Sequence, residues 1–582
     1  MKILLTAINA KYIHSNLAVY SLLAYAKENR AAVEIAEYTI NHRREYILQE
    51  IYKKKPDVLC FSCYIWNYEY VCQIAAEFHK LRPDTPIWVG GPEVSYEIEK
   101  LFSEHPAFYG VMIGEGEKTF LRLTNYYCRK EPLDLSEIPG IAYRKGYRGK
   151  GADQIVQTLP GEPLNMNEIP FCYDHIEDFS NRIIYYESSR GCPFSCSYCL
   201  SSIDRHLRFR DIELVKKDLL FLIEKEVPQV KFVDRTFNCS HSHAMEIWRF
   251  IKEKDRGMTN FHFEIAADLL TEEELELLSS FRPGLVQFEI GVQSTNPATI
   301  AEIHRTMGLS AVSSAVALIQ KAGNIHIHLD LIAGLPYEGY ERFARSFRDI
   351  YALKPDQLQL GFLKVLKGSY MYEHRAEYGI LYGDRPPYEV MQTKWISYDE
   401  ILKIKLVEEM LEVYYNSGQF EVTMKLLDAV YADSFAFFLS LGQFYERNGY
   451  LDRNHSRIKR CELLLEFLKE EGKISEDLMQ ESLLYDLYYR ENMKSRPYWA
   501  KNPAEFAKIS RLYCKKGKTS HIEPFFYHFP TKNQRTITNL PERLTKEIYV
   551  LFEYEKRDAL THQAGVTEIR DQEEDRNGKT HE

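Results

Sequence analysis

A chain of 582 residues with 45% hydrophobic residues is too long for one core, so we expect about three or four domains. Its net charge of -10 argues against a general polyanion binder, because counterion release needs a basic surface, and nucleic acid is an unexpected partner. The start of the sequence lacks a signal-peptide apolar region, and no apolar stretch reaches the roughly 18 residues that span a bilayer. The sequence therefore predicts a cytoplasmic protein without a membrane partner.

The first 130 residues alternate β-rich and helical segments, which predicts an α/β domain. The predicted strands are residues 3–7, 33–40, 58–65, 87–90 and 109–113. This alternation is typical of a parallel sheet covered on both faces, whose ligands bind beyond the carboxyl ends of the strands. Gly90 ends the fourth strand and Gly91 follows it, while Gly114, Glu115 and Gly116 follow the fifth. Glycines there let the backbone approach a bulky ligand closely.

The remaining chain divides into four segments. Residues 131–182 are rich in proline and glycine and predict a linker with a β-hairpin. Residues 183–382 resume the βα alternation, with strands at 183–188, 230–233, 261–266, 286–292, 325–332 and 358–366, which predicts a partial (β/α)6 barrel similar to a TIM barrel. Residues 383–567 read as a mainly α-helical domain, and the charged residues 568–582 as a disordered tail.

The helical domain carries a capping-box pattern at Ser397 and Glu400. An apolar stripe follows at Leu402, Leu406, Met410 and Val413. We expect this stripe to face the core.

Cys192, Cys196 and Cys199 form a Cys-x3-Cys-x2-Cys pattern directly after the first predicted barrel strand. Three thiolates this close on one loop can ligate three irons of a [4Fe-4S] cluster and leave the fourth iron without a protein ligand. Zinc is the alternative, and it would need a fourth Cys or His at a fixed offset nearby. The next candidates, His206 and Cys239, match no usual zinc-finger spacing. The pattern therefore favours a cubane cluster with one open iron.

This loop resembles the cluster loop of the radical S-adenosylmethionine (radical SAM) enzymes, which have the same cysteine spacing and an aromatic residue, here Tyr198, before the last cysteine. The resemblance implies that SAM binds the open iron. It also implies that one electron from the reduced cluster cleaves the sulfonium bond to a 5'-deoxyadenosyl radical. The electron would come from a one-electron reductant such as flavodoxin or ferredoxin.

The amino-terminal segment is similar to the Rossmann-like (flavodoxin-like) cobalamin-binding domain that precedes many radical SAM domains. Gly90, Gly91, Gly114, Glu115 and Gly116 carry this resemblance, which implies that they contact cobalamin. The Asp-x-His-x-x-Gly motif that supplies an axial histidine in relatives of the methionine-synthase type is absent. The cobalamin is therefore expected to be base-off, with no histidine ligand. The alternative is a Rossmann-like domain without cobalamin, since a fold alone does not imply a ligand.

Later strand ends resemble the SAM-contacting positions of the family. Seven residues are expected near SAM: Tyr198, Asp234, Glu264, Glu289, Gln293, Arg305 and Gly334. The resemblance implies that Asp234 receives the amino group of SAM and that the segment with Gly334 pairs with adenine. The guanidinium of Arg305 suits bidentate pairing with the SAM carboxylate. The plainer explanations are a helix cap for Asp234 and a tight turn for Gly334.

The remaining candidate cysteines and a histidine are expected not to bind a cofactor. Cys60 and Cys63 end a hydrophobic strand and are predicted to be buried thiols, and Cys239 is predicted to be structural. His14 lies near the end of the first strand. It is within possible reach of a corrin, but we expect an exposed loop histidine.

Together the resemblances imply a cobalamin-dependent radical SAM methyltransferase that acts on an unactivated carbon or phosphorus centre of a small molecule or natural product. Two alternatives stay open. One is a radical SAM enzyme of another reaction type, such as rearrangement, oxidation or tRNA modification, with a substrate-binding or vestigial amino-terminal domain. The other is a non-enzymatic corrinoid or iron-sulfur binding protein. The helical remainder resembles a carboxyl-terminal domain of unknown function from one subgroup and does not indicate the substrate.

Overall fold

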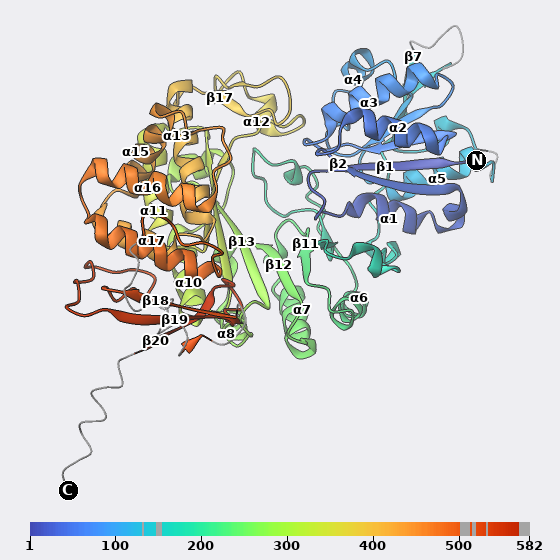
Figure 1. Cartoon of the computed structure of the whole chain (residues 1–582). Coiled ribbons are helices and arrows are strands. Elements are labelled where there is room, and N and C mark those ends of the chain that lie inside the picture. Colours follow the sequence, from blue (N-terminus) through green and yellow to red (C-terminus); the bar gives the residue numbers. More distant parts are fainter. Residues whose placement is uncertain (131–132, 147–153, 501–512, 515–518, 531–533, 570–582) are drawn as a thin grey trace.

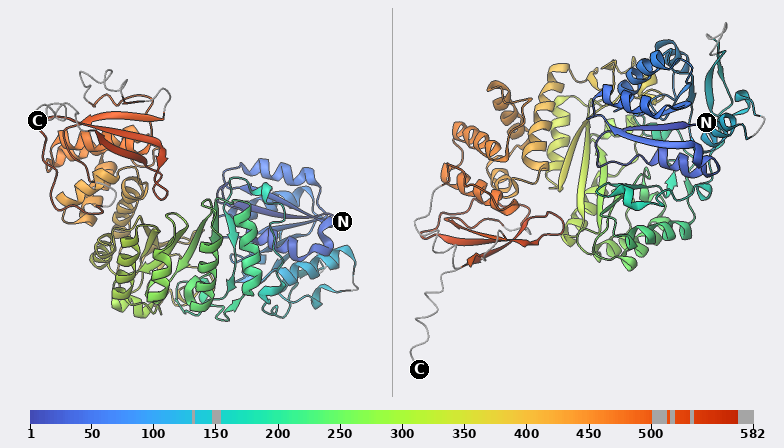
Figure 2. Two further views of the ribbon diagram at one scale, coloured as in Figure 1. Left: turned by 90° about the horizontal axis from the view of Figure 1, so that it is seen from below. Right: turned by 45° about the vertical axis from the view of Figure 1, so that its right-hand side comes forward.

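The computed structural model describes residues 1–130, 133–146, 154–500, 513–514, 519–530 and 534–569. An amino-terminal α/β domain, a central parallel sheet with its helices and a helical carboxyl-terminal part follow one another along the chain (Figure 1). The first and last of these lie on opposite sides of the central part (Figure 2). Across these described ranges, no helix combines the length and the apolar character needed to cross a bilayer.

The amino-terminal domain is built on a seven-stranded sheet in the order β2-β1-β3-β4-β5-β6-β7. Its strands are β1 (Ile3–Asn9), β2 (Val33–Thr39), β3 (Val58–Ser62), β4 (Ile87–Gly90), β5 (Gly110–Met112), β6 (Ile141–Lys145) and β7 (Gln154–Gln157). Strands β1 to β5 are parallel. The order 2-1-3-4-5 is that of flavodoxin-like folds and confirms the expected fold class. It places the switch point, where ligands bind, between β1 and β3.

Helices cover both faces of this sheet, because its central strands are apolar on both sides. The helices are α1 (Leu17–Tyr25), α2 (Arg44–Lys54), α3 (Tyr68–Leu81), α4 (Ile98–Glu104) and α5 (Glu117–Cys128). Helices α2, α3 and α4 bury Ile51, Val71 and Leu101 on one face, whereas α1 and α5 bury Val19 and Leu123 on the other (Figure 1). The predicted hairpin is present as β6 and β7, and it extends this sheet through an antiparallel pairing with β5.

The central part is a six-stranded sheet, all parallel, in the order β15-β14-β13-β12-β11-β8. Its strands are β8 (Ile184–Tyr186), β11 (Gln229–Phe232), β12 (Asn260–Ile265), β13 (Val286–Gln293), β14 (His326–Ala333) and β15 (Gln357–Phe362). Its helices are α6 (Ile212–Glu224), α7 (His241–Lys254), α8 (Glu272–Ser279), α9 (Pro297–Glu302), α10 (Leu309–Ala322) and α11 (Tyr340–Tyr351). Each of the six predicted strands overlaps one observed strand, which confirms the partial barrel.

The two faces of this sheet differ in polarity. Residues along β13 and β14 alternate between buried and half-buried. The buried set is apolar and packs against the helices, because successive side chains of a strand point to opposite faces. The other set is mostly polar and continues onto β11 and β12. Lys231 pairs with Glu264 and Glu289 across the strands, and so does His262 with Glu289, whereas His328 and Asp330 contact each other along β14. The open barrel therefore has a charged inner face.

A short segment leads from β15 to the carboxyl-terminal part through α12 (Tyr370–Glu373), β16 (Leu381–Tyr382) and β17 (Val390–Gln392). The helices that follow are α13 (Tyr398–Leu411), α14 (Glu421–Val430), α15 (Ser434–Arg447), α16 (Arg457–Glu471) and α17 (Glu476–Arg490). An antiparallel sheet of β18 (Ser520–Phe525), β19 (Ile548–Arg557) and β20 (Ala564–Ile569) completes it. Glu568 and Ile569 thus belong to a strand, and residues 570–582 lie outside the described residues.

The predicted capping box at the start of α13 is confirmed, since the Ser397 and Glu400 side chains bond each other's backbone. The predicted stripe is wrong at Leu402, which is exposed; Ile401 and Ile404 are buried in its place. Side chains of α13, α15 and α16 share one continuous core with the central sheet, including contacts of Phe347 and Tyr351 on α11 with α15.

Candidate functional site

The three cysteines lie on a loop that is closed at its base by two short strands. Strands β9 (Ser189–Arg190) and β10 (Arg208–Phe209) pair antiparallel and place Arg190 opposite Arg208. Between them, Gly191 adopts φ +89°, and a Cβ at this position would lie 2.5 Å from the backbone oxygen of His206. Only glycine fits there, so the glycine before Cys192 sets the turn into the loop.

The cysteine side chains are largely enclosed. Cys192 and Cys196 are each 8% exposed, and Cys199 is half-buried. Backbone hydrogen bonds fix the loop: the Cys192 N–H donates to Asp204 O (3.0 Å) and the Cys199 N–H to Cys196 O (3.1 Å). Burial raises the pKa of the Cys196 thiol, Arg305 opposes this rise, and the neighbouring Cys199 and Cys192 add to it. The three thiols are therefore electrostatic neighbours.

The donor set fits an iron-sulfur cluster better than a single ion. Within the described ranges, no three His, Cys, Asp or Glu side chains converge to hold one metal ion. In a cubane each thiolate ligates a different iron, so its cysteines need not converge on one point. The three soft sulfur donors on one loop suit that arrangement.

The end of β13 lies beside this loop. Gln293 has φ +71°, and the pairing with β14 shifts register there. Arg305 donates from Nη2 to the Gly291 carbonyl and from Nη1 to Cys196 Sγ (3.7 Å) and the Tyr198 hydroxyl (3.5 Å). Gln293 Oε1 and Arg305 Nε are buried without a hydrogen-bond partner among the described residues. Buried polar atoms are rarely left unpaired, so this spot suits a polar ligand such as SAM.

Asp234 is buried at the end of β11 and already has partners. Its oxygens accept hydrogen bonds from the Ser188 N–H (3.0 Å), the Ser188 hydroxyl (2.6 Å) and the Ser189 hydroxyl (2.6 Å). A short 3-10 helix (Phe237–Cys239) begins after Thr236, and α7 begins after Ser240, so Asp234 caps neither. Asp234 ties β11 to the strand that enters the cluster loop, and its contact with SAM stays a prediction.

Glu264 and Glu289 belong to the charged inner face of the barrel. Lys231 Nζ lies 3.0 Å from Glu289 Oε2 and 3.8 Å from Glu264 Oε1, and His262 Nε2 lies 3.1 Å from Glu289 Oε2. Burial would raise the pKa of Glu289, but the His262 hydrogen bond and the Lys231 charge outweigh it and lower the pKa to about 2. Glu289 is thus an ionised partner of Lys231.

Gly334 forms a tight turn after β14. It has φ +86°, and a Cβ there would lie 2.6 Å from Val390 Cγ1. Of the residues expected near SAM, the structure therefore brings Tyr198, Gln293 and Arg305 together beside the cysteines. Glu264 lines the neighbouring cavity, and Asp234, Glu289 and Gly334 are engaged in contacts within the protein.

A cavity of about 810 Å³ lies between the amino-terminal domain and the barrel. All five residues expected to contact cobalamin line it: Gly90, Gly91, Gly114, Glu115 and Gly116. Residues that follow β1 and β3, at the switch point, complete this wall, among them Ala10 and Tyr64. The opposite wall includes Gly191 at the start of the cluster loop and Lys231 of the barrel. Gly114 has φ +79° and open space where a Cβ would stand, so its side of the cavity can receive a bulky ligand.

The structure also shows the burial of the cysteines and the histidine that were not expected to bind a cofactor. Cys60 and Cys63 are buried, as predicted, and burial raises the pKa of both thiols. Cys239 is half-buried. The prediction for His14 is wrong: it is half-buried in the cavity wall, because its Nδ1 is hydrogen-bonded to the Tyr185 hydroxyl (2.6 Å).

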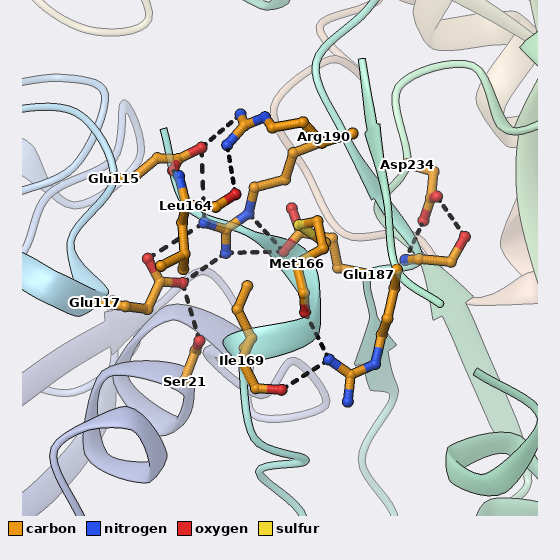
Figure 3. Close-up of polar contacts among 12 residues, drawn as sticks. Ser21, Glu115, Glu117, Leu164, Met166, Ile169, Glu187, Arg190 and Asp234 are labelled. Atoms are coloured by element: carbon orange, nitrogen blue, oxygen red, sulfur yellow. Dashed lines mark hydrogen bonds and ion pairs between the residues drawn. The ribbon is translucent and has the colours of Figure 1, made fainter. Parts of the chain in front are cut away.

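Sequence reasoning missed an ion-pair network between the two walls of the cavity, which Figure 3 shows. Arg190 pairs with Glu117 and Glu187, and Arg208 pairs with Glu115. Burial raises the pKa of Glu187 to about 7, against the effect of Arg190. The only available signal was an arginine just before the cysteine loop and the acidic Gly-Glu-Gly-Glu segment. Their pairing spans 73 and 93 residues of sequence, so no local pattern reveals it.

Three family models match successive segments of the chain. Residues 3–124 match the B12 binding domain, residues 186–350 the radical SAM superfamily, and residues 376–552 a protein of unknown function, DUF4080.

Two curated relatives are methyltransferases. The chain is 27% identical over 310 residues to 2-(S-pantetheinyl)-carbapenam-3-carboxylate methyltransferase of Streptantibioticus cattleyicolor, covering 50% of this chain and 44% of the relative. It is 26% identical over 314 residues to the cobalamin-dependent radical SAM methyltransferase TokK of Streptomyces tokunonensis, covering 51% and 44%. The chain thus spans less than half the length of these relatives.

A solved structure shares the fold. The radical SAM methyltransferase TsrM from Kitasatospora setae, determined with cobalamin and a [4Fe-4S] cluster bound, superposes with a TM-score of 0.53 at 18% identity. The match covers 67% of this chain and 79% of TsrM. This likeness shows a common fold, in which an α/β domain precedes a partial barrel.

Proposed function

We propose that this chain, a radical SAM protein with an amino-terminal B12-binding domain and a DUF4080 region, is a cobalamin-dependent radical SAM methyltransferase. One observation carries the proposal: the glycine turns that suit a corrin line the same cavity as Gly191, Leu200, Ser201 and Asp204 of the loop that bears the three cysteines. Two cofactors held on facing walls can act on one substrate between them. The methyltransferase activity of the matched relatives supports this reaction type.

Cys192, Cys196 and Cys199 would hold the cluster, and Tyr198, Gln293 and Arg305 would bind and orient SAM beside it. The unpaired Gln293 Oε1 and Arg305 Nε are buried groups that SAM would satisfy. When bound, cluster and SAM supply a 5'-deoxyadenosyl radical that takes a hydrogen from substrate, and cobalamin supplies the methyl group. The protein's own contribution is to position these groups and exclude water.

The cobalamin is proposed to bind base-off and without a histidine ligand. Among the described residues that line the cavity, His14 is the only histidine, and its Nδ1 is occupied by Tyr185. Gly90, Gly91 and Gly114 would let the backbone approach the corrin. The substrate is proposed to be a small molecule or natural product with an unactivated carbon or phosphorus centre, and the electron donor a flavodoxin or ferredoxin in the cytoplasm.

The test uses full-length protein reconstituted anaerobically with iron, sulfide and hydroxocobalamin. It is incubated with a reductant, SAM carrying a deuterated methyl group, and a metabolite extract. We expect corrin absorption on the purified protein, release of 5'-deoxyadenosine and a deuterated methyl group on one product. Release of 5'-deoxyadenosine without retained corrin would refute the cobalamin half. Retained corrin without a mass gain would point to another radical reaction.

The cluster ligands are tested by single alanine variants of the three cysteines. Each is expected to lose most of its iron and sulfide, because the cubane needs three thiolates. Cys239→Ala is the matched control, since Cys239 lies near Cys192 but off the loop. It should retain iron at the wild-type level. Equal iron in all four variants would contradict the ligand assignment.

A further inference from the structure

The base of the cluster loop, strands β9 and β10, is attached to the amino-terminal domain by charge. Arg190 stands two residues before Cys192, and its side chain crosses to the other domain. Its Nη2 donates to Glu117 Oε1 (2.5 Å) and its Nη1 to Glu117 Oε2 (3.2 Å), a bidentate pair. Nε also donates to Glu187 Oε2 (3.0 Å). Bidentate arginine–carboxylate pairs fix orientation as well as distance.

The second strand of the base is attached in the same way. Arg208 Nη2 donates to Glu115 Oε1 (2.6 Å) and to Asp204 Oδ2 (2.6 Å), which lies within the loop. Glu115 Oε2 in turn accepts from the Leu164 N–H (2.6 Å). Because Arg190 and Arg208 face each other across β9 and β10, two acidic residues hold both ends of the cysteine loop.

The acidic partners are themselves held rigidly. Glu117 begins α5, its side chain is 6% exposed, and its Oε1 accepts from the Ser21 hydroxyl of α1 (3.0 Å). Burial is the largest influence and would raise the pKa of Glu117, but the charge and hydrogen bond of Arg190, a backbone N–H and the Ser21 hydroxyl together lower it. Gly116 before it packs closely on α1, since a Cβ would lie 2.9 Å from Leu22 Cδ2. Glu117 is thus fixed by two helices of its own domain.

The segment that holds the loop also lines the cavity. Gly114, Glu115, Gly116 and Glu117 form part of the cavity wall, and Arg190 and Gly191 continue it. A ligand in the cavity contacts the turn that bears Glu115 and Glu117, whose carboxylates bind Arg208 and Arg190 at the loop base. Occupancy of the cavity is therefore linked to the position of the cysteines through a few rigid contacts.

We propose that Glu115 and Glu117 are positioning residues for the iron-sulfur loop, through which a corrin in the amino-terminal domain influences the geometry of the SAM site. This inference rests on the proposed function, since it assigns cofactors to both walls. It adds a coupling between the two sites, and such coupling is reciprocal for binding free energies.

The test measures SAM binding to the reduced cluster by electron paramagnetic resonance. Full-length protein is reconstituted with iron and sulfide, with and without hydroxocobalamin. In the wild type we expect hydroxocobalamin to change the dissociation constant of SAM by about fivefold or more, the usual lower range for allosteric coupling. In Glu117→Gln this ratio should approach one, with iron and corrin content retained. In Glu115→Gln the ratio should also approach one, but it is measured at saturating hydroxocobalamin, because Glu115 is itself a proposed corrin contact.

The matched control is Glu37→Gln. Glu37 of β2 also forms a buried pair with an arginine across the two parts, Arg182 (2.6 Å), but it does not contact the cluster loop. This variant should keep the wild-type ratio. Arg190→Lys and Arg208→Lys test geometry at constant charge. Lysine can form neither the bidentate pair of Arg190 with Glu117 nor the spread contacts of Arg208 with Glu115, Asp204 and the Leu164 carbonyl. Both should alter the spectrum of the reduced cluster even without hydroxocobalamin.

Several results would overturn the proposal. One is a wild-type protein that binds both ligands without any coupling. Another is Glu117→Gln with unchanged coupling and an unchanged cluster spectrum. If Glu117→Gln folds but loses its iron while Glu37→Gln retains it, the positioning role is supported. The coupling is then measured on Glu115→Gln, because the Glu115–Arg208 pair is more exposed. Failure of the wild type to retain corrin would instead refute the proposed function, while the cluster spectra of the lysine variants still test the loop.

Discussion

At the scale of single residues, Gly191 shows how one position controls the cluster loop. Its φ of +89° and the 2.5 Å approach of its would-be Cβ to His206 O exclude every other residue type. The positive φ alone costs a non-glycine residue about 1 kcal/mol, and the backbone collision adds to that. The loop cannot relieve the collision without moving Cys192, the next residue.

We therefore expect Gly191→Ala to fold but to retain only a small fraction of the wild-type iron after reconstitution. Gly257→Ala is the matched control, because Gly257 has a similar φ of +83° and nothing within 4 Å of its would-be Cβ. It should lose about 1 kcal/mol of unfolding free energy and keep its iron. Iron analysis together with urea unfolding checks both variants. Full iron in Gly191→Ala would show that the loop tolerates a different turn.

At the scale of elements, α14 depends on a cap from another helix. Its own preceding residue, Phe420, provides no side-chain cap. The Asp486 carboxylate of α17 accepts the Val422 and Thr423 N–H groups instead, each at 2.9 Å. Burial raises the pKa of Asp486 to about 7, far above its usual 3.8.

This shift predicts a pH-dependent contribution to stability. The folded protein keeps the Asp486 proton that the unfolded chain releases near its usual pKa, so the unfolding free energy contributed by Asp486 falls as the pH rises from about 4 to about 7. Asp486→Asn cannot ionise and should lose this slope. Urea unfolding of both proteins at about pH 5 and pH 8 measures the difference. An identical pH response in the two would contradict it.

The sequence predicted the strands of both parallel sheets because their apolar runs and flanking turns are local signals. It also located the capping box of α13, which needs only Ser397 and Glu400. It did not predict that Leu402 is exposed, since the phase of a helix follows from the partner it packs against. Likewise, the polar alternation along β14 was visible, but only the fold shows that these residues meet in the barrel interior.

At the scale of the whole molecule, two domains enclose one cavity, and a ligand there should stabilise them together. Mass action gives about 2.7 kcal/mol at a ligand concentration of 100 times the dissociation constant. We expect hydroxocobalamin to raise the Tm of the wild type. The four glycines and Glu115 of the wall were predictable because each lies at a strand end or just after one. The facing wall was not, because it depends on how the two domains dock.

Gly114→Phe should abolish this thermal shift by filling the cavity, since Gly114 has open space beside it. Gly449→Phe is the matched control, with a similarly positive φ of +67° and no neighbour within 4 Å, but far along the chain. Both should cost stability in the absence of ligand, and only Gly449→Phe should keep the shift. Differential scanning fluorimetry with and without hydroxocobalamin checks this. A normal shift in Gly114→Phe would place the ligand elsewhere.

The core shared by α11 and α15 means that the barrel cannot be separated from the carboxyl-terminal helices without exposing apolar side chains. Phe347 stacks edge-on against Phe435 and Phe438, so the DUF4080 region supplies part of the interior that the barrel needs. A truncated gene ending after β16 would encode a barrel with a bare apolar flank and a tendency to aggregate. The DUF4080 region and the barrel are therefore expected to unfold as one cooperative unit, because each completes the core of the other.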